Sequence, residues 1–196
     1  GEGGMITTNN GNLYSRMKTM RLHGMNRDAW DRYTSPKASW EYDIIAPGFK
    51  SNLPDILAAI GREQLKKADS FFDKRKAHVM FYNNALKDFD FVSTPPDGDG
   101  NAWHLYLLRL NLDKLKCTRD TFALELQQKG IGISMHYIPL FNFTYWKNLY
   151  KDFTKEYFPN AQNQYLRTIT IPLWPDMTEQ MTAQVVKAIK ETGAVR

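Results

Sequence analysis

In the stretch APGFKSNLPDILAAIGREQLKK, residues 46–67, an irregular Pro/Gly segment turns into a long helix near the middle of the expected organisation of the chain. Asn52 offers a side-chain oxygen that can cap the helix, and Pro54 suits a first turn whose N–H groups have no helical partner. A helix that begins in this way directs free N–H groups and positive dipole at whatever precedes it. The stretch therefore predicts either an ordinary capped helix or a binding site for a phosphate or carboxylate.

An apolar stripe continues this helix through Phe72, Val79 and Leu86 at spacings of three and four residues. We expect a long connecting helix over residues 61–92, with Gly61 as its most flexible point. Such a length exceeds what a compact domain of this size needs, and long helices usually bridge two domains or bend.

Before the helix, residues 5–8 have a strand pattern that Asn9-Asn10-Gly11 closes, and residues 12–24 have a helical one. The irregular segment 25–42 carries aromatic side chains, among them Trp30 and Tyr33, and we expect it to pack on its own domain or on a second subunit. The Gly-rich start without an initiator Met predicts that the chain is cut from a longer protein.

After the helix, residues 93–196 have the pattern of a small α+β domain with three strands and flanking helices. The expected strands are residues 102–110, 131–138 and 168–171. The expected helices are one capped by Thr118 and ended by Gly130, one over 160–167, and one capped by Thr178 and ended by Gly193.

Composition describes a globular protein, with 42% apolar and 24% charged residues among 196. The net charge of +5 is spread thinly and no aromatic-basic groove motif accompanies it, so we expect no nucleic-acid partner. A single cysteine, Cys117, and the absence of a leader pattern favour the cytoplasm. No apolar run approaches the roughly 20 residues of a membrane span.

The titratable residues give no reactive group by themselves. His23, His78, His104 and His136 lack metal-ligand spacing, and no CxxC pair or carboxylate cluster occurs, so we expect no metal site. We expect His104 to be half-buried in its strand. Ser134 and His136 would share a strand face without forming a catalytic pair. The residues alone thus indicate a soluble α+β protein and leave its function open.

Several blocks in chain order resemble the pyridoxal-phosphate sugar aminotransferases of the DegT and StrS type. They are GEGGMITT at 1–8, RLHGM at 21–25, APGFKSNLPD at 46–55, AAIG at 58–61, AWHLY at 102–106, GIGISMHYIP at 130–139 and PLWPDMT at 172–178. The blocks span essentially the whole chain.

The resemblance implies an α/β protein of the aspartate-aminotransferase type (fold type I) that works as a homodimer. Residues 1–60 would be the C-terminal remnant of the large domain, which binds the cofactor, residues 61–92 the connecting helix, and residues 93–196 the small α+β domain. In this family the Schiff-base lysine lies a few residues before the Gly-Glu-Gly-Gly block, and none of the sixteen lysines here has that context. The resemblance thus implies no catalytic residue in this chain, which alone would be inactive and bind pyridoxal 5'-phosphate weakly or not at all.

The resemblance also implies binding roles. Asn52 would reach the cofactor phosphate in the partner's active site, assisted by Lys50 and Ser51, although Ser51 stands where many relatives have Tyr. His136 and Tyr137 would meet the nucleotide-sugar. Trp30 and Tyr33 would line the sugar pocket or the dimer contact.

The implied reaction is amino transfer from glutamate to a nucleotide-linked keto sugar. A second possibility is a sugar dehydratase of the same family, which has histidine in place of the Schiff-base lysine. A third is a non-catalytic module that binds a protein partner.

Overall fold

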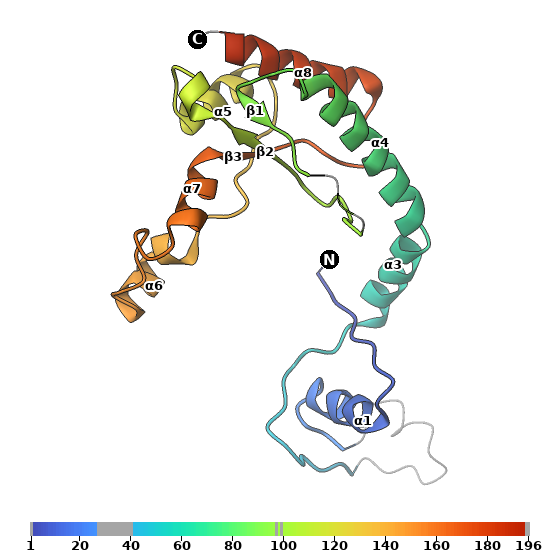
Figure 1. Cartoon of the computed structure of the whole chain (residues 1–196). Helices are drawn as coiled ribbons and strands as arrows, with labels where there is room; N and C mark the ends of the chain where they lie inside the picture. Colours follow the sequence, from blue (N-terminus) through green and yellow to red (C-terminus); the bar gives the residue numbers. More distant parts are fainter. Residues whose placement is uncertain (1, 27–40, 97, 99, 195–196) are drawn as a thin grey trace. The chain divides into compact units, whose positions relative to one another are not determined.

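Figure 1 shows the computed structural model of the chain, which describes residues 2–26, 41–96, 98 and 100–194. The chain separates into two compact units, Gly1–Lys67 and Ala68–Arg196. Their boundary differs from the predicted organisation, in which a connecting helix over 61–92 separated residues 1–60 from residues 93–196. The predicted assignment of these parts to a large and a small domain remains a prediction.

The expected single helix is two helices, α3 (Asp55–Leu65) and α4 (Ala68–Leu86). A turn at residues 66–67 separates them. There the N–H of Lys67 donates to the carbonyl of Gln64, three residues back, which tightens the end of α3 into a turn of the 3₁₀ type. Gly61 was expected to be the flexible point, but it lies inside α3.

In the first unit, Asn10 caps α1 (Gly11–Met20) by accepting hydrogen bonds from the N–H groups of Asn12 and Leu13. This confirms a helix after the Asn-Asn-Gly turn. The strand expected at residues 5–8 is absent from the described part of the chain, where these residues are irregular and exposed. Among the described residues of this unit, no strand pairs with them to complete a ladder.

Residues 20–25 and 44–51 run side by side through backbone hydrogen bonds, including one from the Ser51 N–H to the Arg21 carbonyl at 2.8 Å. The two backbones touch at Gly24 and Gly48. A Cβ atom on Gly24, whose φ is +73°, would lie 1.8 Å from the Ala46 carbonyl oxygen, and one on Gly48 would lie 2.0 Å from the Gly24 nitrogen. Glycine is required at both positions because backbone atoms, which cannot rotate away, fill the space.

The second unit contains a three-stranded antiparallel sheet in the order β1 (Val92–Ser93), β2 (Tyr106–Leu110), β3 (Thr168–Ile171). β3 coincides with the predicted strand, and β2 is the C-terminal half of the predicted strand 102–110. β1 was not predicted, because two residues give no periodicity. The strand expected at 131–138 is wrong: among the described residues this segment makes one isolated bridge, Ser134 to Thr170.

One face of the sheet packs against helices. Tyr106 and Leu108 of β2 and Ile169 and Ile171 of β3 are fully or almost fully buried there. Tyr82 of α4 meets the Tyr106 ring edge to face at 5.1 Å and donates to the Pro172 carbonyl. α5 (Arg119–Gln128) packs on β3, and α8 (Glu179–Ala194) packs on α4 and α5 (Figure 1). This layer holds the hydrophobic core.

Hydroxyl caps begin both of these last two helices, as predicted. Thr118 Oγ1 accepts from the Thr121 N–H, and Thr178 Oγ1 accepts from the Met181 N–H. Gly130, at φ +80°, follows the end of α5 as expected. α8 continues through Gly193, the predicted end.

The remaining elements are η1 (Leu112–Lys114), η2 (Leu140–Asn142), α6 (Thr144–Leu149) and α7 (Pro159–Arg167). Figure 1 shows α6 away from the sheet, with α7 between α6 and β3. α7 confirms the helix predicted over 160–167, and it packs against β2. His104, expected to be half-buried in a strand, lies before β2 and is exposed.

Replacing Gly193 by alanine tests the packing of α8 on the core. A Cβ atom there would lie 2.2 Å from Cζ of Phe91, a ring that is 3% exposed and stacks on Phe89. We expect Gly193→Ala to lower the free energy of unfolding by about 1–3 kcal/mol, as overpacking does, measured by urea denaturation.

Gly61→Ala is the matched control, because a Cβ atom there meets nothing within 4 Å. Alanine is favoured over glycine inside a helix by up to about 1 kcal/mol, so this variant should not lose stability. A Gly193→Ala protein as stable as the wild type would contradict the packing described.

Candidate functional site

The second face of the sheet carries polar side chains. Leu107 and Arg109 of β2 stand opposite Thr170 and Thr168 of β3, and all four lie on the face away from the helical core. Thr168 Oγ1 donates to the Gln164 carbonyl at 2.7 Å, which ties the end of α7 to the start of β3. The strands thus present a partly polar surface to residues 135–140, which we call the crossing segment because they pass over this face of the sheet.

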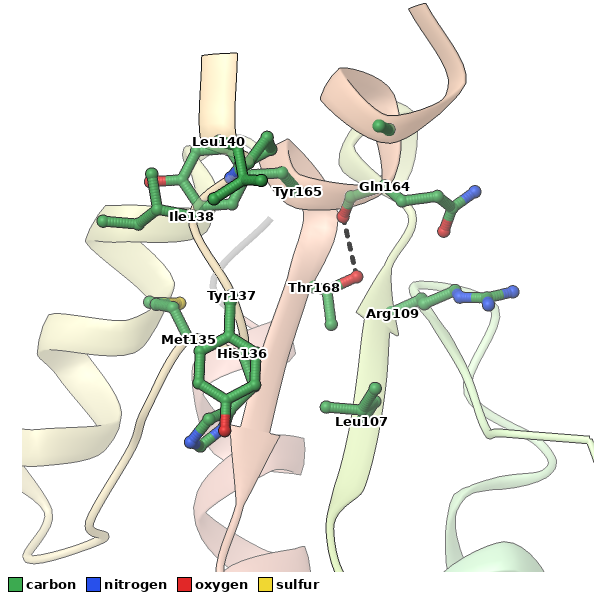
Figure 2. A pocket seen from close by; sticks show the side chains of 12 residues that line it. Leu107, Arg109, Met135, His136, Tyr137, Ile138, Leu140, Gln164, Tyr165 and Thr168 are labelled. Carbon is green, nitrogen blue, oxygen red and sulfur yellow. Dashed lines mark hydrogen bonds between the residues drawn. The ribbon is translucent and has the colours of Figure 1, made fainter. Parts of the chain in front are cut away.

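Leu107, Arg109 and Thr168 of this face line a cavity of about 580 Å³. Its walls are the segment 135–140 on one side and Ala161, Gln164 and Tyr165 of α7 on the other. Figure 2 shows His136 and Tyr137 on the crossing segment, while the Arg109 side chain extends away from them. Aromatic rings, an imidazole, hydroxyls and an amide together suit a ligand with both apolar faces and hydroxyl groups.

His136 is fixed in this cavity by Thr170. Its Nδ1 lies 2.8 Å from Thr170 Oγ1, and Thr170 is 6% exposed. The Tyr137 ring meets the imidazole edge to face at 4.7 Å, and Tyr137 is 74% exposed. The site therefore combines an imidazole of fixed orientation with a phenol that reaches solvent.

A buried arginine supports the α7 wall. The Arg119 guanidinium lies 4.5 Å from the centre of the Tyr165 ring, and its Nη1 donates to the Tyr165 carbonyl. Arg119 is 7% exposed, and it also pairs with Asp120 at 2.7 Å. Because Tyr165 lines the cavity, this arginine determines where that wall stands.

The first unit holds the other group of predicted site residues. Lys50 Nζ lies 2.6 Å from Asn52 Oδ1, so the lysine donates to the amide oxygen and the amide NH₂ remains a donor. Ser51 lines a separate cavity of about 470 Å³ together with Arg21 and Tyr14. Ammonium, hydroxyl and amide donors in one segment are the groups that bind a phosphate.

The predicted capping role of Asn52 is wrong. α3 begins at Asp55 with Pro54 as its N-cap residue, and no side-chain cap is formed. Asn52 lies two residues before that cap and is bonded to Lys50 instead. Asp55 also places a carboxylate in the first turn, which lowers the attraction of the helix start for an anion. Anion binding here would depend on side chains more than on the helix end.

The predicted site residues therefore fall into separate groups. Lys50, Ser51 and Asn52 lie together in the first unit, while His136 and Tyr137 lie together in the second. Trp30 and Tyr33 lie outside the described residues. Their roles stay predictions.

Sequence reasoning missed the residues that support His136 and the cavity wall. Thr168 and Thr170 are two apart in a predicted strand, so a shared polar face was readable from their spacing. The supporting role of Arg119 could not be predicted from the sequence, because its contact partner Tyr165 lies 46 residues away.

No group of three or more His, Cys, Asp or Glu side chains is placed to hold a metal ion among the residues described. None of the helices in the described ranges combines the length and the hydropathy of a bilayer span.

Comparisons with known proteins identify the relatives of this chain. The model of the DegT/DnrJ/EryC1/StrS aminotransferase family matches residues 1–190. Uncharacterized protein MJ1066 of Methanocaldococcus jannaschii is 42% identical over 193 residues, covering 97% of this chain and 50% of that protein. Spore coat polysaccharide biosynthesis protein SpsC of Bacillus subtilis is 36% identical over 194 residues, covering 97% of this chain and 49% of SpsC. The chain spans about half the length of the curated relatives it matches.

Solved structures agree with this match. The putative sugar aminotransferase Spr1654 from Streptococcus pneumoniae, in its PMP form, has a TM-score of 0.81 and 27% identity. The match covers 94% of this chain and 45% of that chain. Its PLP form gives the same TM-score at 26% identity, covering 96% of this chain and 45% of that chain. The expected fold, a mixed helix and strand structure matching the C-terminal half of sugar aminotransferases of this kind, is thereby confirmed.

Thr170→Val tests whether the buried hydroxyl orients His136. Valine fills a similar volume but cannot hydrogen-bond to Nδ1, so the imidazole should lose its fixed orientation. We expect altered His136 ring ¹⁵N shifts and tautomer populations by NMR in Thr170→Val, and shifts near those of the wild type in Thr170→Ser. The exposed His104 is the internal control. Identical His136 spectra in all three proteins would show that Thr170 does not act on the ring.

Proposed function

Because this chain belongs to the DegT/DnrJ/EryC1/StrS aminotransferase family, we propose that it is part of a pyridoxal-phosphate-dependent enzyme that aminates a nucleotide-linked keto sugar with glutamate as donor. The observation that carries the proposal is the family match over residues 1–190, which includes the residues of both candidate groups. The PMP and PLP forms of the Streptococcus pneumoniae relative support the cofactor.

Pyridoxal phosphate, when bound, supplies an electron-withdrawing ring through which an amino group passes from donor to acceptor. In this chain, Lys50 and Asn52 supply an ammonium and an amide N–H to its phosphate, and Ser51 adds a hydroxyl. The three side chains fit a phosphate by their donor types. The proposal includes a homodimer in which these residues serve the partner's active site.

The cavity beneath His136 binds the sugar. Imidazole and phenol groups hydrogen-bond to hydroxyls, and aromatic rings pack against the apolar faces of a pyranose. His136, held by Thr170, then orients the sugar, while Tyr137 covers it at the exposed rim. These residues bind and orient the substrate, and none of them is proposed to carry the amino group.

We assign no catalytic residue to residues 1–196. None of the sixteen lysines has the sequence context of the Schiff-base lysine in this family. Residues 1–196 alone are therefore proposed to be inactive, and the complete protein is proposed to act in the cytoplasm, which agrees with the unpaired state of Cys117. Burial raises the pKa of the Cys117 thiol, and the nearby Glu125 raises it further, so this thiol is a poor nucleophile.

The reaction is tested with the complete protein, pyridoxal phosphate, glutamate and a panel of nucleotide-linked keto sugars. We expect formation of 2-oxoglutarate together with an aminated sugar detected by mass spectrometry. Omitting the keto sugar should abolish turnover, as should using residues 1–196 alone. Loss of water from the sugar without amino transfer would contradict the proposal in favour of a dehydratase.

Asn52→Ala tests the proposed phosphate contact in the complete protein. A hydrogen bond to a charged group contributes about 1.5–3 kcal/mol, so we expect the dissociation constant of pyridoxal phosphate to rise about tenfold or more, measured by absorbance titration. The fold should be kept because Asn52 is only half-buried. Asn12→Ala, an exposed position in α1, should leave cofactor affinity unchanged. Equal affinities in the wild type and Asn52→Ala would remove Asn52 from the site.

A further inference from the structure

A second cavity lies in the part of the second unit that leads away from the sheet. Its volume is about 490 Å³, and Phe141 of η2 and Gln162 of α7 line it together with Lys147, Lys151 and residues 153–156. Asn142 Nδ2 donates to Gln162 Oε1 at 3.2 Å in its wall. The cavity is therefore built between η2, α6 and α7.

Positive charge gathers around this cavity. Lys147, Lys151 and Lys155 line it, and Glu156 is the one carboxylate among its lining residues. Glu156 lies 3.8 Å from Lys155, and a hydrogen bond from Thr154 together with its own backbone N–H lowers the pKa of its carboxyl group. Among the described residues no carboxylate pairs with Lys147 or Lys151. Three ammonium groups facing one carboxylate repel one another and attract an anion.

Stacked aromatic rings support these lysines. Phe153 stacks on Tyr150 at 5.1 Å and on Tyr157 at 5.7 Å, and Tyr150 stacks on Trp146 at 5.9 Å. Lys147, Lys151 and Lys155 are interspersed among these rings at intervals of four residues. Ring packing restricts the backbone that carries these exposed lysines, all three of which line the one cavity.

The second cavity adjoins the proposed sugar site through a shared wall. Pro139 and Leu140 line the first cavity, and Phe141 and Asn142, the next two residues, line the second. On α7, Ala161 lines the first cavity and Gln162 the second. A ligand with two linked parts can therefore place one part in each cavity.

We propose that Lys147 and Lys151, with Lys155, bind the diphosphate of the nucleotide-linked sugar while its sugar occupies the cavity beneath His136. The inference rests on the proposed function for the identity of the sugar. The assignment of a diphosphate to this cavity rests on the charge of the three lysines, because lysine commonly binds phosphate groups as a point charge.

The experiment is calorimetric titration of the complete protein with UDP-glucose and with inorganic pyrophosphate as probes. In Lys147→Gln/Lys151→Gln, we expect both dissociation constants to rise about tenfold, since exposed charge pairs each contribute up to about a factor of five. The affinity of the wild type should fall more steeply with added salt than that of the variant. Lys187→Gln/Lys190→Gln removes the same charge from α8 and should change either constant less than twofold.

Two further variants distinguish the loss of charge from a loss of fold, and the binding of the sugar from the binding of the diphosphate. Lys147→Arg/Lys151→Arg should restore binding of both probes. His136→Ala should weaken UDP-glucose and leave pyrophosphate unchanged, because only the sugar reaches the first cavity. Unchanged binding in Lys147→Gln/Lys151→Gln, or no binding of either probe by the wild type, would overturn the site.

The two proposals can fail separately. If the lysine variants lose both probes but no keto sugar is aminated, the diphosphate site stands and the proposed function falls. If amination proceeds with the same KM in Lys147→Gln/Lys151→Gln as in the wild type, the function stands and the diphosphate site falls.

Discussion

The alternation of side chains along β2 and β3 is the constraint on which the second unit depends. Tyr106 and Leu108 point into the helical core, and Leu107 and Arg109 lie on the opposite face of the sheet, where they line the cavity of the candidate site. A shift of one residue in the pairing would exchange the two sets and expose the core. The burial of Tyr106, which also contacts Tyr82, therefore fixes the register that places the site residues.

Polar contacts around the site connect the segments that line it to the strands and to the core. Thr170 projects from β3 to His136, and Arg119 reaches from α5 to Tyr165. Both are buried polar residues whose hydrogen bonds would be costly to leave unmade. Through these contacts, the crossing segment and α7 take their positions from the sheet and core, although neither is a strand of the sheet.

The features predicted correctly from the sequence are those that depend on neighbouring residues along the chain, such as helix caps and short strands. The cap at Thr118 and the strand 168–171 were predictable because hydroxyl caps and a four-residue β-branched run are local signals. The strand at 131–138 failed because its apolar pattern serves packing against the core and one bridge to Thr170, without a ladder. Asn52 failed as a cap because Pro54 took that position, a choice that local preference alone could not decide. The two cavities depend on contacts distant in sequence, such as Asn142 with Gln162 and Arg119 with Tyr165, which no periodicity reveals.

The close backbone contact between Gly24 and Gly48 limits which residues can be varied in protein engineering. Backbone atoms occupy the space that a methyl group would need at either position, so any other residue there would push residues 20–25 and 44–51 apart. The outward-facing neighbours, such as Phe49 and Ile45, are free of that restriction. Redesign of the Lys50–Asn52 segment should therefore treat the two glycines as fixed points and vary the residues around them.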